Sequence, residues 1–301
     1  MTPAGRGEAL EVLRTMPRHV ENMLRGLPRP LLLWAPAPGK WCIAEVLAHW
    51  LDVETDVYLA AYSRAASGAD VEAERFDPDA RALARGTAAE PPHELLRAWK
   101  RARREALSRL DAHPEARWSV CVTQAGMALE LGAFVAQHAA HDRAHARQIE
   151  GILERHALLG RLAAMPSEID AVLELAVVPL EGVQQTIARL GDFERRMLVA
   201  YARIVEQDRP QLSWLEATAA PPGGTAPPLA AVRRDFERLR SATHALLYAC
   251  GPRLWQRRGI DPRLGERTLA DLVARHLDHD TQCLAALRKI LTCSPVASPP
   301  R

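Results

Sequence analysis

Residues 131–153, LGAFVAQHAAHDRAHARQIEGIL, decide the fold class of this 301-residue chain. Apolar side chains recur every three or four positions along this stretch, which is the spacing of the buried face of an amphipathic helix. The same face carries His138, His141 and His145. A buried imidazole needs a partner, so the stretch predicts a helix whose core face holds a polar site.

The same helical periodicity continues through the rest of the first half of the chain. The composition is rich in Ala, Leu, Arg and Glu and poor in β-branched runs, which favours helix. Residues 114–130 are expected to be irregular or to form a short hairpin. We expect four helices, near residues 8–27, 42–66, 94–112 and 129–155. Four amphipathic helices with short or proline-rich connections indicate a helical bundle.

The second half of the sequence repeats the first. LGAFVAQHAAHD (131–142) aligns without gaps on LADLVARHLDHD (269–280). HWLDVETDVYLAAYSRA (49–65) aligns on RLGDFERRMLVAYARIV (189–205), and further matches follow in the same order. This pattern indicates a tandem duplication. We therefore predict an all-α protein of two four-helix bundles, residues 1–158 and 159–293, with the boundary near 156–162 and a disordered tail at 294–301.

The bulk properties of the sequence exclude several classes of protein. The net charge is +2 and the arginines are spread along the sequence, so we expect no nucleic-acid partner. No run of about 18 apolar residues exists, and the N-terminus lacks the apolar core of a signal peptide, so we expect a cytoplasmic protein without a membrane span. The five cysteines are widely spaced and odd in number, which favours reduced thiols.

Three histidines have the spacing of a metal site. His141 and His145 are four positions apart on a predicted helix, so their side chains point the same way, about 6 Å apart. His49 lies on the inner face of the second predicted helix and can supply a third nitrogen. Three imidazoles leave a position open for water or substrate and favour zinc, nickel or iron(II). His138, one turn earlier, is expected to support the site or to lie in the core.

The residues around these histidines resemble a known family. GKWCIAEVLAHWLDVE (39–54) followed by QHAAHDRAHARQI (137–149) is similar to the DinB-like superfamily of small bacterial proteins. The resemblance implies a four-helix bundle in up-down-down-up order. It places the metal-binding triad of the family on His49, His141 and His145. Cys42 replaces the hydroxyl residue that the family has at that position.

The resemblance also sets the expected function. Members of the family include transferases that use low-molecular-weight thiols, and a maleylpyruvate isomerase. We therefore expect a metal-dependent transferase or hydrolase that acts on a small-molecule substrate. Zinc or nickel is the expected metal, with iron as a further candidate, and a low-molecular-weight thiol is the expected second cofactor. The sequence predicts no catalytic residue beyond the ligands. It allows a homodimer, and also a non-catalytic ligand-binding or assembly module with structural histidines.

The second half departs from this pattern at the proposed ligands. Arg189 stands where His49 does, while His279 and Cys283 match His141 and His145. Arginine is not a metal ligand, so we predict that the second bundle has lost its site. Arg189 is expected to pair instead with Asp192, Asp278 or Asp280.

Two carboxylates lie beside the proposed ligands in the sequence. Asp52 and Asp142 are expected either to orient imidazoles or to be exposed helix charges. Cys42 is expected to be a small buried hydrophobe and not a reactive thiol.

Overall fold

The computed structural model describes residues 2–73, 76–77, 80–81, 90–174, 181–212 and 227–292. The tail predicted to be disordered, residues 294–301, lies outside these ranges. The chain divides into two compact units. The first comprises Met1–Ala35 and Gly39–Leu153, and the second comprises Pro36–Pro38 and Glu154–Arg301.

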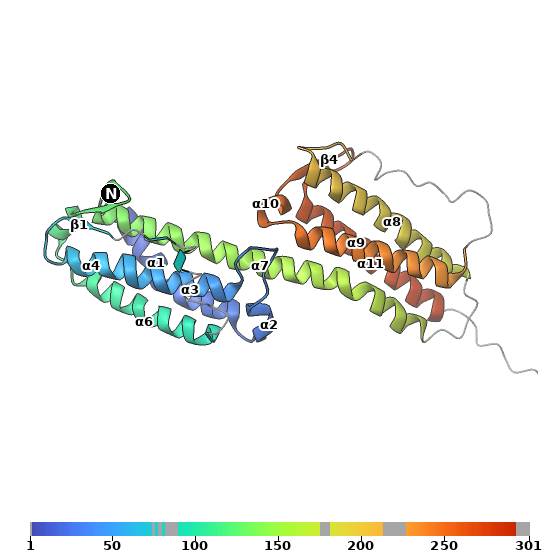
Figure 1. The fold of residues 1–301 in the computed structure, drawn as a ribbon, viewed down its shortest axis with the longest axis horizontal. Coiled ribbons are helices and arrows are strands. Elements are labelled where there is room, and N and C mark those ends of the chain that lie inside the picture. The colour runs from blue at the N-terminus through green and yellow to red at the C-terminus, as the bar shows by residue number, and fades with distance from the viewer. Residues whose placement is uncertain are drawn as a thin grey trace, which may run out of the picture. The chain divides into compact units, whose positions relative to one another are not determined.

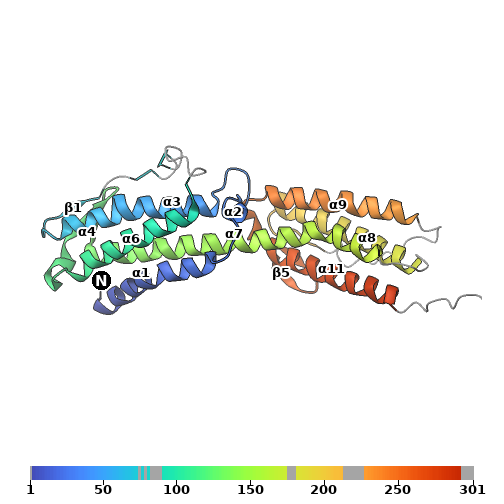
Figure 2. The same ribbon diagram turned by 90° about the horizontal axis from the view of Figure 1, so that it is seen from below.

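The first unit is a four-helix bundle, which confirms the predicted all-α fold. Its elements are α1 (Pro3–Leu24), α2 (Arg29–Leu32), α3 (Ile43–Val53), η1 (Glu54–Leu59), α4 (Ala60–Ala65), α6 (Pro92–Asp111) and the first part of α7 (Leu131–Leu173). Helices α1 and α7 run in one direction and α3 and α6 in the other, the up-down-down-up order (Figures 1 and 2).

Large apolar side chains fill the interior of this bundle. Leu13, Leu47, Trp50, Trp99 and Phe134 come from its four long helices and are at most 1% exposed. Trp50 stacks on Trp99, with the ring centroids 4.6 Å apart, and so joins α3 to α6. Burial of such side chains stabilises the bundle by about 1.5–3 kcal/mol each before entropy is counted.

A short sheet precedes α7, where the sequence predicts irregular chain or a hairpin. A 3₁₀ turn, η3 (Glu115–Ser119), leads into β2 (Cys121–Gln124), which pairs antiparallel with β3 (Met127–Glu130). Ala125 and Gly126 between them both have positive φ, 49° and 82°, as a two-residue hairpin turn requires. The strand β1 (Val71–Glu72) pairs parallel with β2.

The second unit has the same order of elements. The C-terminal part of α7 is followed by α8 (Glu181–Glu206), α9 (Leu229–Ala249), α10 (Pro252–Trp255), a hairpin of β4 (Arg258–Asp261) and β5 (Gly265–Thr268), and α11 (Leu269–Thr292). The end of α7 and α11 run in one direction, while α8 and α9 run in the other (Figure 2).

Helix α7 differs from the prediction at its C-terminal end. The sequence predicts a helix that ends near residue 155 and a boundary near 156–162, but α7 continues to Leu173. The stretch 154–165, ERHALLGRLAAM, contains one glycine and no proline, so nothing in it ends a helix. The division between the units therefore falls inside α7, after Leu153.

None of the helices in the described ranges contains a stretch long and apolar enough to cross a lipid bilayer.

Candidate metal centre

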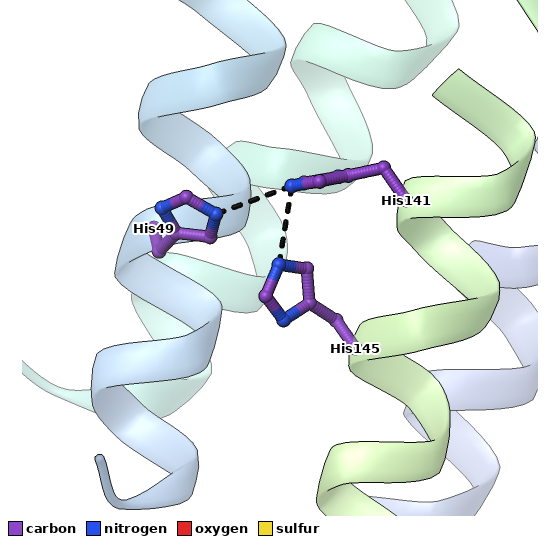
Figure 3. Close-up of side chains that lie close together, drawn as sticks. All are labelled: His49, His141 and His145. Atoms are coloured by element: carbon purple, nitrogen blue, oxygen red, sulfur yellow. Dashed lines mark hydrogen bonds between the residues drawn. The ribbon is translucent and has the colours of Figure 1, made fainter. Parts of the chain in front are cut away.

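The structure brings the three predicted ligands together. His49 lies on α3, and His141 and His145 lie one turn apart on α7, with their rings turned toward one another (Figure 3). The Nε2 atom of His141 lies 3.2 Å from Nε2 of His49 and 3.1 Å from Nε2 of His145. In the described part of the chain, this is the one group of three or more His, Cys, Asp or Glu side chains placed to hold a metal ion.

Burial keeps all three imidazoles in the neutral form that ligates metals. Burial, together with repulsion by His145, lowers the pKa of His49 to about 4. Burial and repulsion by the other two rings lower the pKa of His141 to about 2. Burial also lowers the pKa of His145. At neutral pH each ring therefore offers one lone pair and carries no charge.

Gln148 fixes which nitrogen of His145 carries the proton. Nδ1 of His145 lies 2.8 Å from Oε1 of Gln148, one turn further along α7. A carboxamide oxygen only accepts, so Nδ1 donates and Nε2 of the neutral ring keeps its lone pair. That lone pair is directed at the other two imidazoles. A hydrogen bond from the second ring nitrogen is the usual support of a histidine ligand.

The arrangement fits a small cation better than it fits hydrogen bonding among the rings. Each ring nitrogen carries either a proton or one lone pair, so Nε2 of His141 cannot donate to one neighbour and accept from the other. Tetrahedral zinc with bonds of about 2.0–2.1 Å requires nitrogens about 3.3 Å apart, close to the two separations found here. Nδ1 of His49 and Nδ1 of His141 are buried and have no hydrogen-bond partner within the described ranges.

Aromatic rings surround the three histidines. The ring of His49 lies 5.1 Å from that of Trp41 and 5.6 Å from that of Phe76, measured between centroids. Trp50 lies 5.6 Å from His145 in an edge-on arrangement. These apolar walls lower the local dielectric and strengthen any electrostatic interaction at the centre.

A buried ion network lies behind the triad. Arg103 on α6 donates to Glu54 at 2.6 Å, to Asp142 at 2.7 Å and to the carbonyl of Leu13 at 3.1 Å. Arg103, Glu54 and Asp142 are at most 1% exposed. One guanidinium thus ties α1, α3 with its η1 extension, α6 and α7 together around the centre.

His138 belongs to this network and not to the triad. Its Nε2 lies 3.1 Å from Glu54, and its Nδ1 lies 3.0 Å from the hydroxyl of Tyr62. Its ring stacks on Tyr58, with the centroids 3.6 Å apart. Both ring nitrogens are engaged, so His138 is a buried core residue, one of the two roles expected from the sequence.

The second unit contains the same network. Arg240 on α9 donates to Glu194 at 2.7 Å, to Asp280 at 2.7 Å and to the carbonyl of Leu162 at 3.2 Å. His276 lies 3.0 Å from Glu194 and 3.0 Å from the hydroxyl of Tyr201. Each contact has its counterpart in the first unit.

The two networks differ in the spacing between their glutamate and their tyrosine, which is one residue longer in the first unit. Tyr62 follows Glu54 by eight positions, and Tyr201 follows Glu194 by seven. In the first unit the π-helical turn η1 lies between the two residues, whereas α8 is α-helical throughout. A π-helical turn accommodates one extra residue, so both tyrosines reach the same histidine.

Among its described residues, the second unit has no counterpart of the triad. His279 stacks on Phe193, with the centroids 3.8 Å apart, and the sulfur of Cys283 lies 3.7 Å from Nε2 of His279. Burial raises the pKa of Cys283 to about 11, so the thiol is protonated at neutral pH.

None of the three ion pairs expected for Arg189 is found among the described residues. Asp192 is bound by Arg195, and Asp280 by Arg240. Within the described ranges, Arg189 forms no ion pair with Asp278 either.

Two other residues singled out in the sequence have different roles from those expected. Asp142 neither orients a ligand nor lies exposed, because Arg103 and the indole nitrogen of Trp50 bind its carboxylate. Asp52 is also buried, and its carboxylate lies 3.7 Å from Arg81.

Cys42 precedes α3, and its backbone N–H donates to Glu45 at 2.7 Å. Burial raises the pKa of its thiol to about 11, so Cys42 behaves as the small buried hydrophobe expected from the sequence.

Arg103 and Tyr62 were not among the residues predicted from the sequence. The signal that could have found them is the alignment of the two halves of the sequence, because Glu54 aligns with Glu194 and both are buried acids in helices. A buried acid requires a buried cation, and Arg103 and Arg240 are the matching arginines on the next long helix of each unit.

The first unit is therefore a helical domain of a recognisable class: an up-down-down-up bundle with a triad of histidines that face one another inside it. Residues 13–149 match the model of the DinB superfamily.

Comparison with solved structures gives a similarity to YfiT from Bacillus subtilis, described as a probable metal-dependent hydrolase with an unusual four-helix bundle topology. The identity is 12% and the TM-score 0.49, over 52% of this chain and 90% of that one. The comparison with curated proteins found no match.

Proposed function

We propose that the first unit is a metal-dependent enzyme whose ion is held by Nε2 of His49, His141 and His145. The observation that carries the proposal is the convergence of three neutral, half-buried imidazoles, one of which has its tautomer fixed by Gln148. Neutral nitrogen ligands favour zinc or nickel, with iron(II) as a further candidate, over magnesium or calcium.

Three protein ligands leave one position for a reactant. When bound, such a metal lowers the pKa of a thiol or a water molecule in that position and provides a nucleophile at neutral pH. The chain holds the ligands in register through α3 and α7, and the rings of Trp41, Trp50 and Phe76 limit the access of bulk water.

The surroundings of the triad favour a thiol over water as the nucleophile. The two buried carboxylates behind the triad, Glu54 and Asp142, raise the pKa values of His141 and His145, respectively, against the larger effect of burial. Arg103 binds both, so neither is free to accept a proton from water. A thiol that loses its proton on binding needs no such base. We therefore propose the transfer of a low-molecular-weight thiol to an electrophilic small molecule, with hydrolysis as the second reaction.

Cobalt(II) substitution tests this proposal. Addition of a small thiol such as cysteamine to the cobalt-loaded protein should produce a sulfur-to-cobalt charge-transfer band, and His141→Ala should abolish it. After incubation with zinc, the parent should couple the thiol to an electrophile faster than His141→Ala, which retains no metal. If a chelator leaves both metal content and thermal stability unchanged, the histidines are structural and the protein is a non-catalytic module.

We also propose that the second unit is a duplicated bundle that has lost its metal site. The matching contacts of Arg103 and Arg240, down to the carbonyls of Leu13 and Leu162, support a common origin. The replacement of His49 by Arg189 and of His145 by Cys283 removes two of three ligands. The duplicated bundle keeps the buried network that holds its helices together.

A further inference from the structure

An apolar cavity of about 580 Å³ lies at one end of the first bundle, away from the three histidines. Leu47 of α3 forms its buried floor, and Leu24, Leu32 and Leu96 are half-buried in its walls. The volume falls within the range of about 300–1,000 Å³ that is usual for small-molecule sites. None of the predicted metal ligands lines it, so it is a separate site.

A basic groove of about 290 Å³ lies between α1 and α6. Glu21 is its one acidic lining residue among those described, and it is paired with Lys100 at 2.8 Å. The sequence prediction that basic side chains are dispersed is wrong here, because two helices bring six of them together. They are Arg14, Arg18, Arg25, Lys100, Arg103 and Arg104.

Part of this positive charge has no ion-pair partner among the described residues. Arg14 is paired with Asp111, and the buried Arg103 is paired within its network. Arg18 and Arg104 are exposed, and neither forms an ion pair with any residue in the described ranges. The groove therefore has two guanidinium groups without an ion pair among the described residues, and guanidinium is the group best suited to bind a phosphate.

The cavity and the groove adjoin. Glu21 and Arg25 line both of them, so the apolar cavity continues into the basic groove along the C-terminal half of α1. A ligand that fills both must be apolar at one end and anionic at the other. The described walls of the cavity are mostly leucine and proline, with His93 as the one aromatic ring, which suits an aliphatic chain better than a stacked base.

We propose that the first unit binds a single-chain amphiphile with a phosphate monoester head group. Its aliphatic chain occupies the cavity, and its phosphate lies between Arg18, Arg25 and Arg104. This binding does not depend on the histidine triad.

Titration calorimetry with dodecyl phosphate, below its micelle concentration, tests the proposal. The intact protein should bind one equivalent. Inorganic phosphate, which lacks the chain, should bind at least 100-fold more weakly, and dodecyl maltoside, which lacks the charge, at least tenfold more weakly. The double variant R18E/R104E should lose at least tenfold in affinity for dodecyl phosphate, and L96Q at least fivefold.

Arg101 provides the matched control, because it is an exposed arginine on the same helix that does not line the groove. R101E should bind within twofold of the parent, as should His141→Ala, and circular dichroism should show that all variants are folded. Unchanged binding by R18E/R104E would overturn the proposal. So would equal binding of inorganic phosphate, or binding to anionic vesicles without binding to the monomeric amphiphile.

Discussion

The guanidinium of Arg103 bonds the carboxylate of Glu54 through Nε at 3.0 Å and through Nη2 at 2.6 Å. Both side chains are at most 1% exposed, and the pair joins α6 to the segment that carries His49. Because Arg103 also binds Asp142, next to His141 on α7, the pair fixes the separation of the two elements that supply the imidazoles.

Arg103→Met should destabilise the first unit by about 3–5 kcal/mol, because it leaves two buried carboxylates without a cation. A urea titration monitored by hydrogen exchange measures the free energy of unfolding of each unit separately. The exposed Arg101 is the control, and R101M should change the free energy of unfolding by less than about 0.5 kcal/mol. A loss below 1 kcal/mol for Arg103→Met would contradict the role given to this network.

The network also predicts how stability depends on pH. Burial raises the pKa of Glu54, but Arg103 and His138 outweigh it and hold the pKa well below its usual range. The carboxylate is therefore more acidic in the folded than in the unfolded chain, where its pKa is about 4.3. Its contribution to stability is complete above about pH 5 and decreases as the pH falls through 4.3 and below.

Glu54→Gln should accordingly be less stable than the parent at pH 7 and should lose less stability between pH 5 and pH 3. Thermal midpoints at several pH values measure both effects. Glu105 is exposed and, among the described residues, pairs only with Arg109 on the same helix, so E105Q should keep the slope of the parent. Parallel curves for E54Q and the parent would show that another group governs acid unfolding.

His141→Ala should reduce the metal content from one equivalent per chain to none, because the remaining two imidazoles cannot form a closed site. Mass-spectrometric metal analysis of untagged protein provides the measurement. His279→Ala, at the matching position of the second unit, should retain the full equivalent. Two equivalents in the parent would instead place a second metal in the second unit.

Gln148→Leu should weaken metal binding by about 10–100-fold without abolishing it, since it removes the group that fixes the tautomer of His145. Competition with a chromogenic chelator measures the affinity. Gln137 on the same helix bonds Gln124 at the surface, so Q137L serves as the control and should bind as the parent does. Equal affinities for the two variants would remove the orienting role of Gln148.

The sequence predicted the bundle and the triad because both rest on helical spacing. His141 and His145 share a face by their separation of four, and His49 could be placed on an inner face by the apolar residues around it. The ion network could not be predicted in the same way, because Arg103 lies among five other basic residues between 97 and 109 and only the packing of α6 shows which one enters the core.

The length of α7 and the presence of the π-helical turn could not be predicted from the sequence either. No residue in the stretch 154–165 ends a helix, yet none shows that the helix continues across two units. The turn η1 becomes visible only when the networks are compared, because the ungapped alignment places Tyr62 opposite Ala202 and not opposite Tyr201.

Deletion of Thr55 should therefore weaken metal binding by the first unit without unfolding it. The deletion gives Glu54 and Tyr62 the spacing of seven found in the second unit, where the same network forms on a regular helix. The first unit should remain folded. Tyr58, which stacks on His138 and lies 6.0 Å from His141, should leave its place beside the triad, and metal affinity should fall at least tenfold.

Circular dichroism and a chelator competition assay measure the two effects of this deletion. Thr55→Ala keeps the length of the helix and removes the hydrogen bonds of the hydroxyl to the carbonyls of Leu51 and Asp52 and to the carboxylate of Asp56, none of which is a predicted ligand, so it should bind metal as the parent does. If the deletion variant keeps full metal affinity, the π-helical turn serves the packing of the network and not the metal centre. A folded variant with weakened metal binding would assign the turn to the site, in keeping with the frequent occurrence of such turns at functional positions.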